Sequence, residues 1–199
     1  MALLSFFREG QVYEVLLTTR SNVTPVGTVR EGHVLKFRLF EGESYHDLLR
    51  DRHASIQVSN SAALIVSLAL NDFSGIEVEN AGPYRWIKSL PGLYGTAACT
   101  EGSWKDAIGE SKVLNCTFFP EGEIEGRLPP IPFSRADCLL VEMAVDFTRV
   151  RLARGRERER LLKRFTENFR LYTRLGGNEM VARRMASELG LPEEFEKIQ

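Results

Sequence analysis

Alternating apolar and polar positions run through the first part of the chain. Residues 13–19 are mostly apolar and rich in strand-forming types, which predicts a strand buried on both faces. Two further runs, 24–30 and 33–40, are separated by Glu31-Gly32, and in the second Val34, Lys36 and Arg38 alternate with Leu35, Phe37 and Leu39. Because glycine adopts positive φ in tight turns, this spacing predicts a hairpin and three consecutive antiparallel strands.

The next segment combines a short helix with a strand. Ser44 is placed to N-cap a helix over 44–52, and Asp47, three residues later, can complete the cap in part. A strand is expected at 53–59, where the composition again favours β-structure. Residues 62–70 are apolar all round, so periodicity allows a helix or a strand, and we favour a helix.

Turn residues divide the middle of the chain. Clusters of glycine and proline, one of them at 129–132, separate stretches of strand-forming composition. These stretches span 84–90, 93–100 and 112–119, and we expect further antiparallel strands there. Residues 138–148 form a long apolar run that predicts one more strand.

Helical periodicity appears only in the last quarter of the chain. Gly176-Gly177 can end one helix and Gly190 a second. The apolar positions of the first helix are Leu161, Leu162, Phe165, Phe169 and Tyr172. We therefore expect a mainly β (α+β) fold, with a β-barrel or sheet in residues 1–148 and a basic helical hairpin in residues 149–199 that packs on the barrel or at a dimer interface.

Positive charge is concentrated in that final segment. Residues 149–187 carry twelve lysines or arginines and four acidic residues, although the whole chain has a net charge of −1. Such asymmetry is typical of a nucleic-acid or partner-binding module, or of a dimer whose basic helices lie on an acidic body. The apolar stripe disfavours nucleic acid, because that face must be buried against protein.

Overall composition excludes several protein classes. At 199 residues, with 43% hydrophobic and 27% charged residues, the chain is neither collagen-like nor disordered. Cys99, Cys116 and Cys138 are odd in number and form no C-x-x-C pair, so we expect buried, inert thiols rather than a disulfide framework. No apolar run is long enough to span a membrane, and we expect a cytoplasmic protein.

Recognisable catalytic motifs are absent from the sequence. The glycine-rich phosphate-binding patterns, the G-x-S-x-G elbow and the H-E-x-x-H zinc motif do not occur. His33, His46 and His53 fall on three different expected elements, so no metal site is predicted. No side-chain nucleophile is therefore evident from the sequence.

One polar cluster has the composition of a cofactor site. A flat heterocycle with a phosphate needs close backbone approach, a cation and hydroxyl groups near a helix start. The residues that supply these features are Thr18, Asn22, Thr24, Val26, Gly27, Arg38, Ser44 and Tyr45. Each also has a plain structural explanation: threonines favour strands, asparagine favours turns, Ser44 can cap a helix, and Arg38 can form a surface ion pair.

The order of these elements resembles a known family. The segments 24–27, 35–38, 44–45 and 133–149 are similar to those of a largely archaeal family of unassigned function, described as FMN-binding split barrels and distantly similar to flavin reductases. The resemblance covers about residues 10–190. It implies a six-stranded antiparallel split barrel that forms a homodimer, with one FMN per subunit near the dimer interface and a nicotinamide or another electron donor.

The resemblance also assigns roles to individual residues. Arg38 and Ser44 would contact the FMN phosphate, and Tyr45 belongs to the same element as Ser44. The ribityl chain and ring would be lined by Thr18, Asn22, Thr24, Val26 and Gly27. Two features depart from the flavin reductase pattern: Asp47 stands where asparagine is usual, so we expect it to point away from the phosphate, and the C-terminal helices have no counterpart in minimal flavin reductases. Reductase activity therefore does not follow from the resemblance.

Overall fold

The computed structural model describes residues 2–128 and 135–191. The chain forms two compact units. One is built from residues 1–60, 72–105 and 110–129, and the other from residues 61–71, 106–109 and 130–199. The predicted turn at 129–132, and residues 133–134 of the segment that carries the family resemblance, lie outside the described residues.

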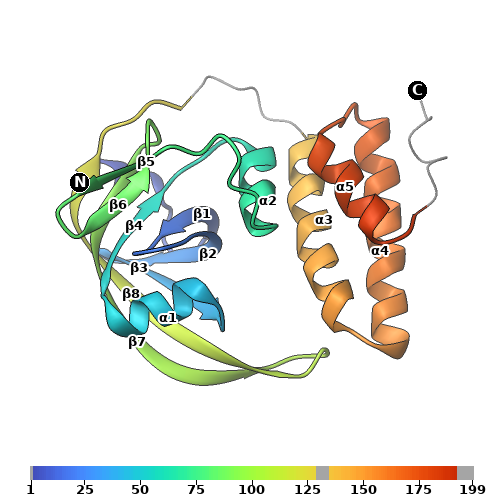
Figure 1. Ribbon diagram of the computed structural model, residues 1–199, viewed down its shortest axis with the longest axis horizontal. Helices are drawn as coiled ribbons and strands as arrows, with labels where there is room; N and C mark the ends of the chain where they lie inside the picture. The colour runs from blue at the N-terminus through green and yellow to red at the C-terminus, as the bar shows by residue number, and fades with distance from the viewer. Residues whose placement is uncertain (1, 129–134, 192–199) are drawn as a thin grey trace. The chain divides into compact units, whose positions relative to one another are not determined.

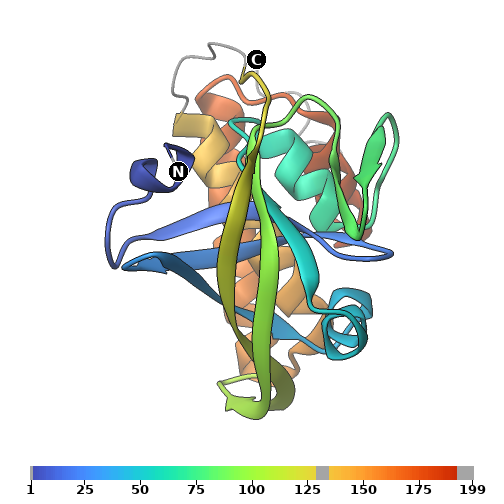
Figure 2. The same cartoon turned by 90° about the vertical axis from the view of Figure 1, so that its left-hand side faces the viewer.

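The first unit is a closed barrel in which every neighbouring pair of strands is antiparallel, in the order β1-β2-β3-β8-β7-β4 (Figure 1). The predicted six-stranded antiparallel barrel is thus confirmed. Figure 2 shows β7 and β8 running together as the longest pair. The strands are β1 (Val12–Thr18), β2 (Val23–Glu31), β3 (Val34–Phe40), β4 (His53–Gln57), β7 (Gly92–Lys105) and β8 (Glu110–Ile124).

Strand register separates an apolar interior from a polar outer wall. Residues paired across antiparallel strands share a face, so Val15 and Val26 both point into the barrel. On β3, Leu35, Phe37 and Leu39 are buried in the same core, and the residues between them point outward. The alternation predicted for this strand is therefore confirmed, and it places Lys36 and Arg38 on the outer wall.

Shorter elements complete this unit. The hydroxyl of Ser55 donates to the carbonyl of Arg85 (2.6 Å), which ties the small β5–β6 sheet to the barrel. Helix α1 starts one residue before Ser44, and Gly42 is its N-cap, so the predicted capping role of Ser44 is wrong. The short elements are η1 (Leu3–Phe6), α1 (Glu43–Arg50), β5 (Val78–Ala81) and β6 (Tyr84–Ile87).

A disulfide joins β7 to β8. Cys99 and Cys116 lie opposite each other in the register, with their Cα atoms 4.1 Å apart, and their sulfur atoms are bonded. The expectation of free thiols is wrong for this pair, because sequence spacing does not reveal which residues a hairpin places face to face. Cys138 is free, and it is exposed rather than buried as expected.

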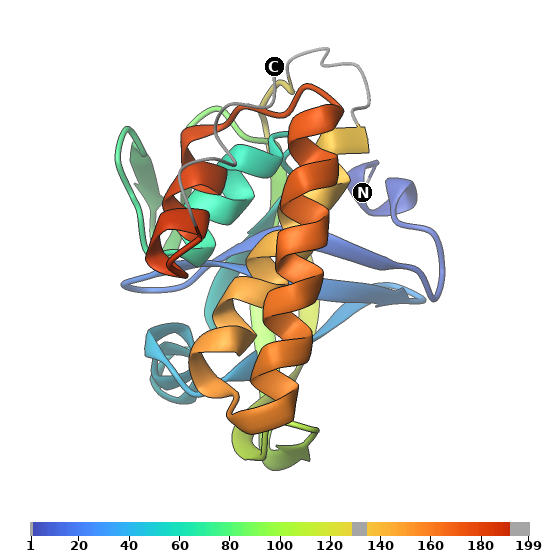
Figure 3. The same ribbon diagram turned by 90° about the vertical axis from the view of Figure 1, so that its right-hand side faces the viewer.

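The second unit consists of helices. Figure 3 shows α3, α4 and α5 packed beside one another. The predicted helix at 62–70 is confirmed as α2, and the two predicted C-terminal helices are confirmed as α4 and α5. The helices are α2 (Ala62–Ala69), α3 (Arg135–Leu152), α4 (Gly155–Arg174) and α5 (Met180–Glu188).

The strand predicted at 138–148 is wrong, because these residues belong to α3. Its buried apolar positions follow the i, i+3, i+4 spacing of a helix: Ala136, Leu140, Met143, Ala144, Phe147 and Val150. Valines and a long apolar run obscured that spacing. The boundary expected between residues 148 and 149 falls inside this helix.

Helix α4 is strongly amphipathic, as predicted. Leu161, Phe165, Phe169 and Tyr172 are all buried within the helical unit. Between α3 and α4, the guanidinium of Arg164 forms an ion pair with the carboxylate of Asp146, which is fully buried. A buried carboxylate needs such a partner, because burial without one is costly.

Candidate functional site

A cavity of about 500 Å³ opens on the outer wall of the barrel. It crosses β2, β3, β8 and β7, and its volume lies in the range of small-molecule and cofactor sites. Its lining is Gly27, Val29, Glu31, Lys36, Phe37, Arg38, Thr100, Asn115, Cys116 and Thr117. Alternation along each strand brings the polar side chains of this lining to one surface, whereas Phe37 and Cys116 belong to the barrel core.

Arg38 is held in place by two neutral groups. Its Nε donates a hydrogen bond to Oδ1 of Asn115 (3.0 Å), and its guanidinium carbon lies 4.0 Å from the ring centroid of Trp104. Among the described residues, no carboxylate lies within ion-pair distance of Arg38. The Arg38 charge is therefore uncompensated, in contrast to Lys36, whose Nζ lies 2.5 Å from Oε2 of Glu31.

Gly27 keeps part of the cavity floor free of side chain. It lies in β2 beside Glu14 of β1, on the outward face. A Cβ atom at this position would lie 3.4 Å from Cγ1 of Val12 and 3.5 Å from Oε1 of Glu14, which are ordinary contacts. The glycine is thus not required by crowding, and the backbone at this position is not covered by a side chain of its own.

A second polar cluster joins the β1–β2 turn to α1. Nδ2 of Asn22 donates to Oγ of Ser44 (3.0 Å), and Oδ2 of Asp47 accepts from the Thr19 hydroxyl (2.7 Å) and from the Ser21 amide (2.7 Å) and hydroxyl (2.9 Å). Ser44, which was expected to contact the phosphate, thus accepts a hydrogen bond from Asn22, which was expected to line the ribityl chain and ring.

Asp47 in this cluster is ionised at neutral pH. Burial opposes its ionisation, but the hydrogen bonds from Ser21 and Thr19 outweigh that effect and hold the pKa of Asp47 below its ordinary value. An ionised carboxylate repels a phosphate. The carboxylate points toward the β1–β2 turn, so the second cluster is a poor anion site.

The other predicted cofactor-binding residues lie apart from the cavity. Thr24 and Val26 share the inward face of β2, because their partners Leu17 and Val15 belong to the barrel core. Thr18 is fully buried, and its hydroxyl has no hydrogen-bond partner in the part of the chain that the structure describes.

Tyr45 also lies away from the cavity, in the barrel core, and its hydroxyl donates to Oε1 of Glu101 (2.7 Å). This hydrogen bond raises the pKa of Tyr45. Of the predicted set, Gly27 and Arg38 line the cavity.

Sequence reasoning missed Asn115, Thr117, Lys36 and Trp104. Asn115 and Thr117 alternate with buried Leu114, Cys116 and Phe118, so the pattern of β8 could have placed them on an outer face. Nothing in that pattern reveals that β8 lies beside β3, because the two strands are far apart in the chain and meet only when the barrel closes.

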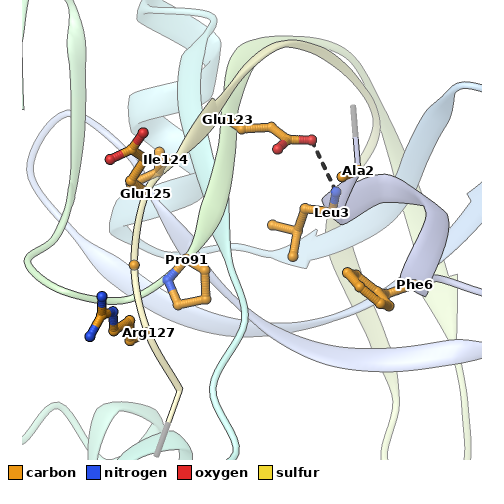
Figure 4. Close-up of a pocket in the computed structure, with 9 residues that line it drawn as sticks. Ala2, Leu3, Phe6, Pro91, Glu123, Ile124, Glu125 and Arg127 are labelled. Carbon is orange, nitrogen blue, oxygen red and sulfur yellow. Dashed lines mark hydrogen bonds between the residues drawn. The ribbon is translucent and has the colours of Figure 1, made fainter.

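Two further cavities have less suitable lining for a phosphate. One of about 550 Å³ lies beside the N-terminal turn, where the Leu3 amide donates to Oε1 of Glu123 (Figure 4). Its charged residues are Glu123, Glu125 and Arg127, so carboxylates outnumber cations. The other, of about 510 Å³, is mostly apolar and its one charged residue is Glu14. Of these three cavities, the outer-wall cavity therefore has the lining best suited to a phosphate.

The described residues offer neither a metal site nor a membrane-spanning helix. No group of three His, Cys, Asp or Glu side chains there is arranged to hold a metal ion. Across the same ranges, 2–128 and 135–191, no helix has both the length and the apolar character required to cross a bilayer.

Comparison with known proteins identifies the family. The model for the N-terminal domain of a protein family of unknown function, DUF447, matches residues 13–126, and a second model of that family matches residues 134–185. The chain therefore belongs to this family. No curated protein matches it.

A solved structure shares the fold. The crystal structure of an FMN-bound protein from Methanosarcina mazei, which carries the same family model, is 22% identical, with a TM-score of 0.63. The match covers 92% of this chain and 96% of that one. These findings confirm the resemblance drawn from the sequence, and at this identity the structural match establishes the fold.

Proposed function

We propose that this member of the DUF447 family binds FMN in the outer-wall cavity, with Arg38 as the main phosphate contact. The observation that carries the proposal is the uncompensated charge of Arg38, held by Asn115 and Trp104 at a cavity of suitable size. Support also comes from the Methanosarcina relative, which shares the fold and was crystallised with FMN.

The residues of the cavity fit the parts of FMN. Arg38 would hold the phosphate through charge-assisted hydrogen bonds, and Gly27 would let the ring approach the β2 backbone. Thr100 and Thr117 offer hydroxyl groups to the ribityl chain. When bound, FMN supplies hydride and electron transfer, which agrees with the lack of catalytic motifs in the sequence.

The oligomeric state, the activity and the electron donor that we propose are those expected from the sequence. The protein would act as a homodimer and as a flavin-dependent oxidoreductase, with a nicotinamide or another electron donor meeting the exposed side of the flavin. A cytoplasmic location stays a prediction.

Titration of the flavin-free protein with FMN and with riboflavin tests the proposal. We expect the wild type to shift the visible absorbance bands of FMN and to quench its fluorescence. Arg38→Ala should weaken FMN binding by about 1.5–3 kcal/mol, the range for a hydrogen bond to a charged group, which is roughly a 10- to 150-fold increase in Kd. Riboflavin binding should stay nearly unchanged, because riboflavin lacks the phosphate.

Arg50→Ala provides the matched control. Arg50 is an exposed arginine at the end of α1 that does not line the cavity, so its removal should leave both affinities unchanged. Equal losses of FMN and riboflavin affinity in Arg38→Ala would assign Arg38 to the fold. A wild-type protein that leaves both flavins unperturbed would overturn FMN binding altogether.

A second candidate function uses the outward face of α4. Arg156, Arg160, Lys163, Arg170 and Arg174 are exposed and recur every three to seven residues, opposite the buried stripe. Such a row of cations suits a nucleic-acid backbone, and binding would weaken steeply as salt rises. If the protein does not bind duplex nucleic acid at low salt, this function is excluded. An acidic protein would then be the remaining partner for the row of exposed cations.

A further inference from the structure

We propose that Asn115 makes the outer-wall cavity selective for a phosphorylated ligand, because it orients Arg38 without neutralising it. Glu31, by contrast, lowers the affinity for phosphate by neutralising Lys36. This inference rests on the proposed function and concerns the charge of the two cations that line the cavity.

The neutral partner of Arg38 is the first observation. Asn115 accepts the Nε–H of Arg38 through an amide oxygen, which carries no formal charge, and the Trp104 ring supplies the other contact. Because Nε is occupied, the terminal Nη groups are the ones left for an anion. A fixed guanidinium loses less conformational entropy when it binds, so the arrangement pre-organises the site.

The contrast with Lys36 is the second observation. Lys36 and Arg38 both point outward from β3, two residues apart, and both line the cavity. The carboxylate of Glu31 lies 2.5 Å from Nζ of Lys36, and both side chains are about half exposed. One cation is thus paired with a carboxylate and the other with an amide, although both stand on the outward face of the same strand.

Asparagine and aspartate have nearly the same shape, so the exchange at position 115 adds a negative charge and replaces the amide NH2 donor with an acceptor oxygen. A carboxylate there would pair with Arg38 and would also repel a phosphate in the cavity. The same reasoning applies in reverse to Glu31, where an amide would release Lys36. Two isosteric substitutions should therefore change phosphate affinity in opposite directions.

The experiment measures the Kd of FMN and of riboflavin for the full-length wild type, Asn115→Asp and Glu31→Gln. Asn115→Asp should raise the Kd of FMN about tenfold, the loss expected for one charge-assisted hydrogen bond. Glu31→Gln should lower it about two- to fivefold, the range for an exposed ion pair. Riboflavin affinity should not change in either variant.

Further variants separate charge from structure. The double variant Asn115→Asp with Glu31→Gln restores the net charge of the cavity and should recover part of the lost FMN affinity. Asn115→Ala removes the orienting hydrogen bond without adding charge, so its effect on FMN should be smaller than that of Asn115→Asp. Thermal unfolding should be similar in all variants, since both side chains are exposed.

The outcomes distinguish the inference from the proposed function. A wild type that binds FMN, together with Asn115→Asp and Glu31→Gln variants of unchanged affinity, would overturn the inference and keep FMN binding. Parallel losses for FMN and riboflavin would assign Asn115 to the shape of the cavity instead of its charge. A wild type that binds neither flavin would overturn the proposed function and the inference with it.

Discussion

The outer-wall cavity and the polar cluster beside α1 contain similar residue types but differ in how their polar groups are used. In the cavity, Arg38 has neutral partners and its charge is uncompensated. In the cluster, Asp47 accepts three hydrogen bonds from the β1–β2 turn, and Ser44 accepts one from Asn22. In the cavity, the charge of Arg38 is therefore available to a ligand. In the cluster, the carboxylate of Asp47 already binds groups of the protein itself.

The difference shows that polar residues near one another in sequence need not act together. Arg38 and Ser44 are six residues apart, and the resemblance to a flavin-binding family assigned both to the phosphate. The structure gives them different partners, and an ionised carboxylate sits beside the second. Variants that separate stability from ligand affinity can test this division.

Loss of the disulfide should have the largest effect on stability. The Cys99–Cys116 bond closes a loop with a sequence separation of 17 residues, and Cys116 lines the outer-wall cavity. Replacing both cysteines with serine should lower the free energy of unfolding by about 3 kcal/mol, measured by urea denaturation. The reduced wild type should match the variant; an unchanged urea midpoint would mean that β7 and β8 need no cross-link.

Asp47→Ala should destabilise the protein by about 2 kcal/mol, because it leaves the Thr19 and Ser21 donors without their acceptor. Urea denaturation measures the change, and FMN titration of the folded variant should give wild-type affinity. If FMN affinity changed by tenfold or more while stability held, the cluster beside α1 would belong to the ligand site.

Acid should weaken the same cluster. Since the pKa of Asp47 is lower in the folded than in the unfolded state, its contribution is complete above the ordinary carboxyl pKa of about 4 and is lost as pH falls toward the folded value. The free energy of unfolding, followed by urea denaturation across this range, should fall less steeply in Asp47→Asn than in the wild type. Parallel curves would show that Asp47 does not couple to folding.

Ser44→Ala should have the smallest effect, about 1 kcal/mol of stability, through loss of the hydrogen bond from Asn22. Because Gly42 and not Ser44 caps α1, the helix itself should persist, as judged by circular dichroism. FMN affinity should equal that of the wild type. A selective loss of FMN over riboflavin in this variant would restore Ser44 as a phosphate contact.

Local patterns predicted most of the barrel correctly. Alternation in β3, the glycine turn at Gly32 and the strand-forming stretches of β7 and β8 each reflect the pleat and sterics of a single hairpin, which a short window of sequence contains. Helix α3 was not predicted because its run of apolar residues fits both the two-residue repeat of a strand and the 3.6-residue repeat of a helix. Only packing against α4 selects the helix.

Pairings across distant strands could not be predicted in this way. The Cys99–Cys116 bond and the Arg38–Asn115 hydrogen bond depend on the register of β7 with β8 and of β3 with β8. A shift of one residue in either register would turn these side chains to the opposite face. The sequence indicates which residues point outward but not which neighbours they meet.

The amino-acid sequence by itself determined the strands of the barrel, the amphipathic character of α4 and the family to which the chain belongs, because each depends on residues that are close together or on ordered motifs. Tertiary structure decided the partners of each charge. Two pairs, Asn115 with Arg38 and Ser21 with Asp47, come together only when the barrel closes and α1 packs against it. These partners leave the Arg38 charge available to an anion and hold the Asp47 carboxylate within the fold.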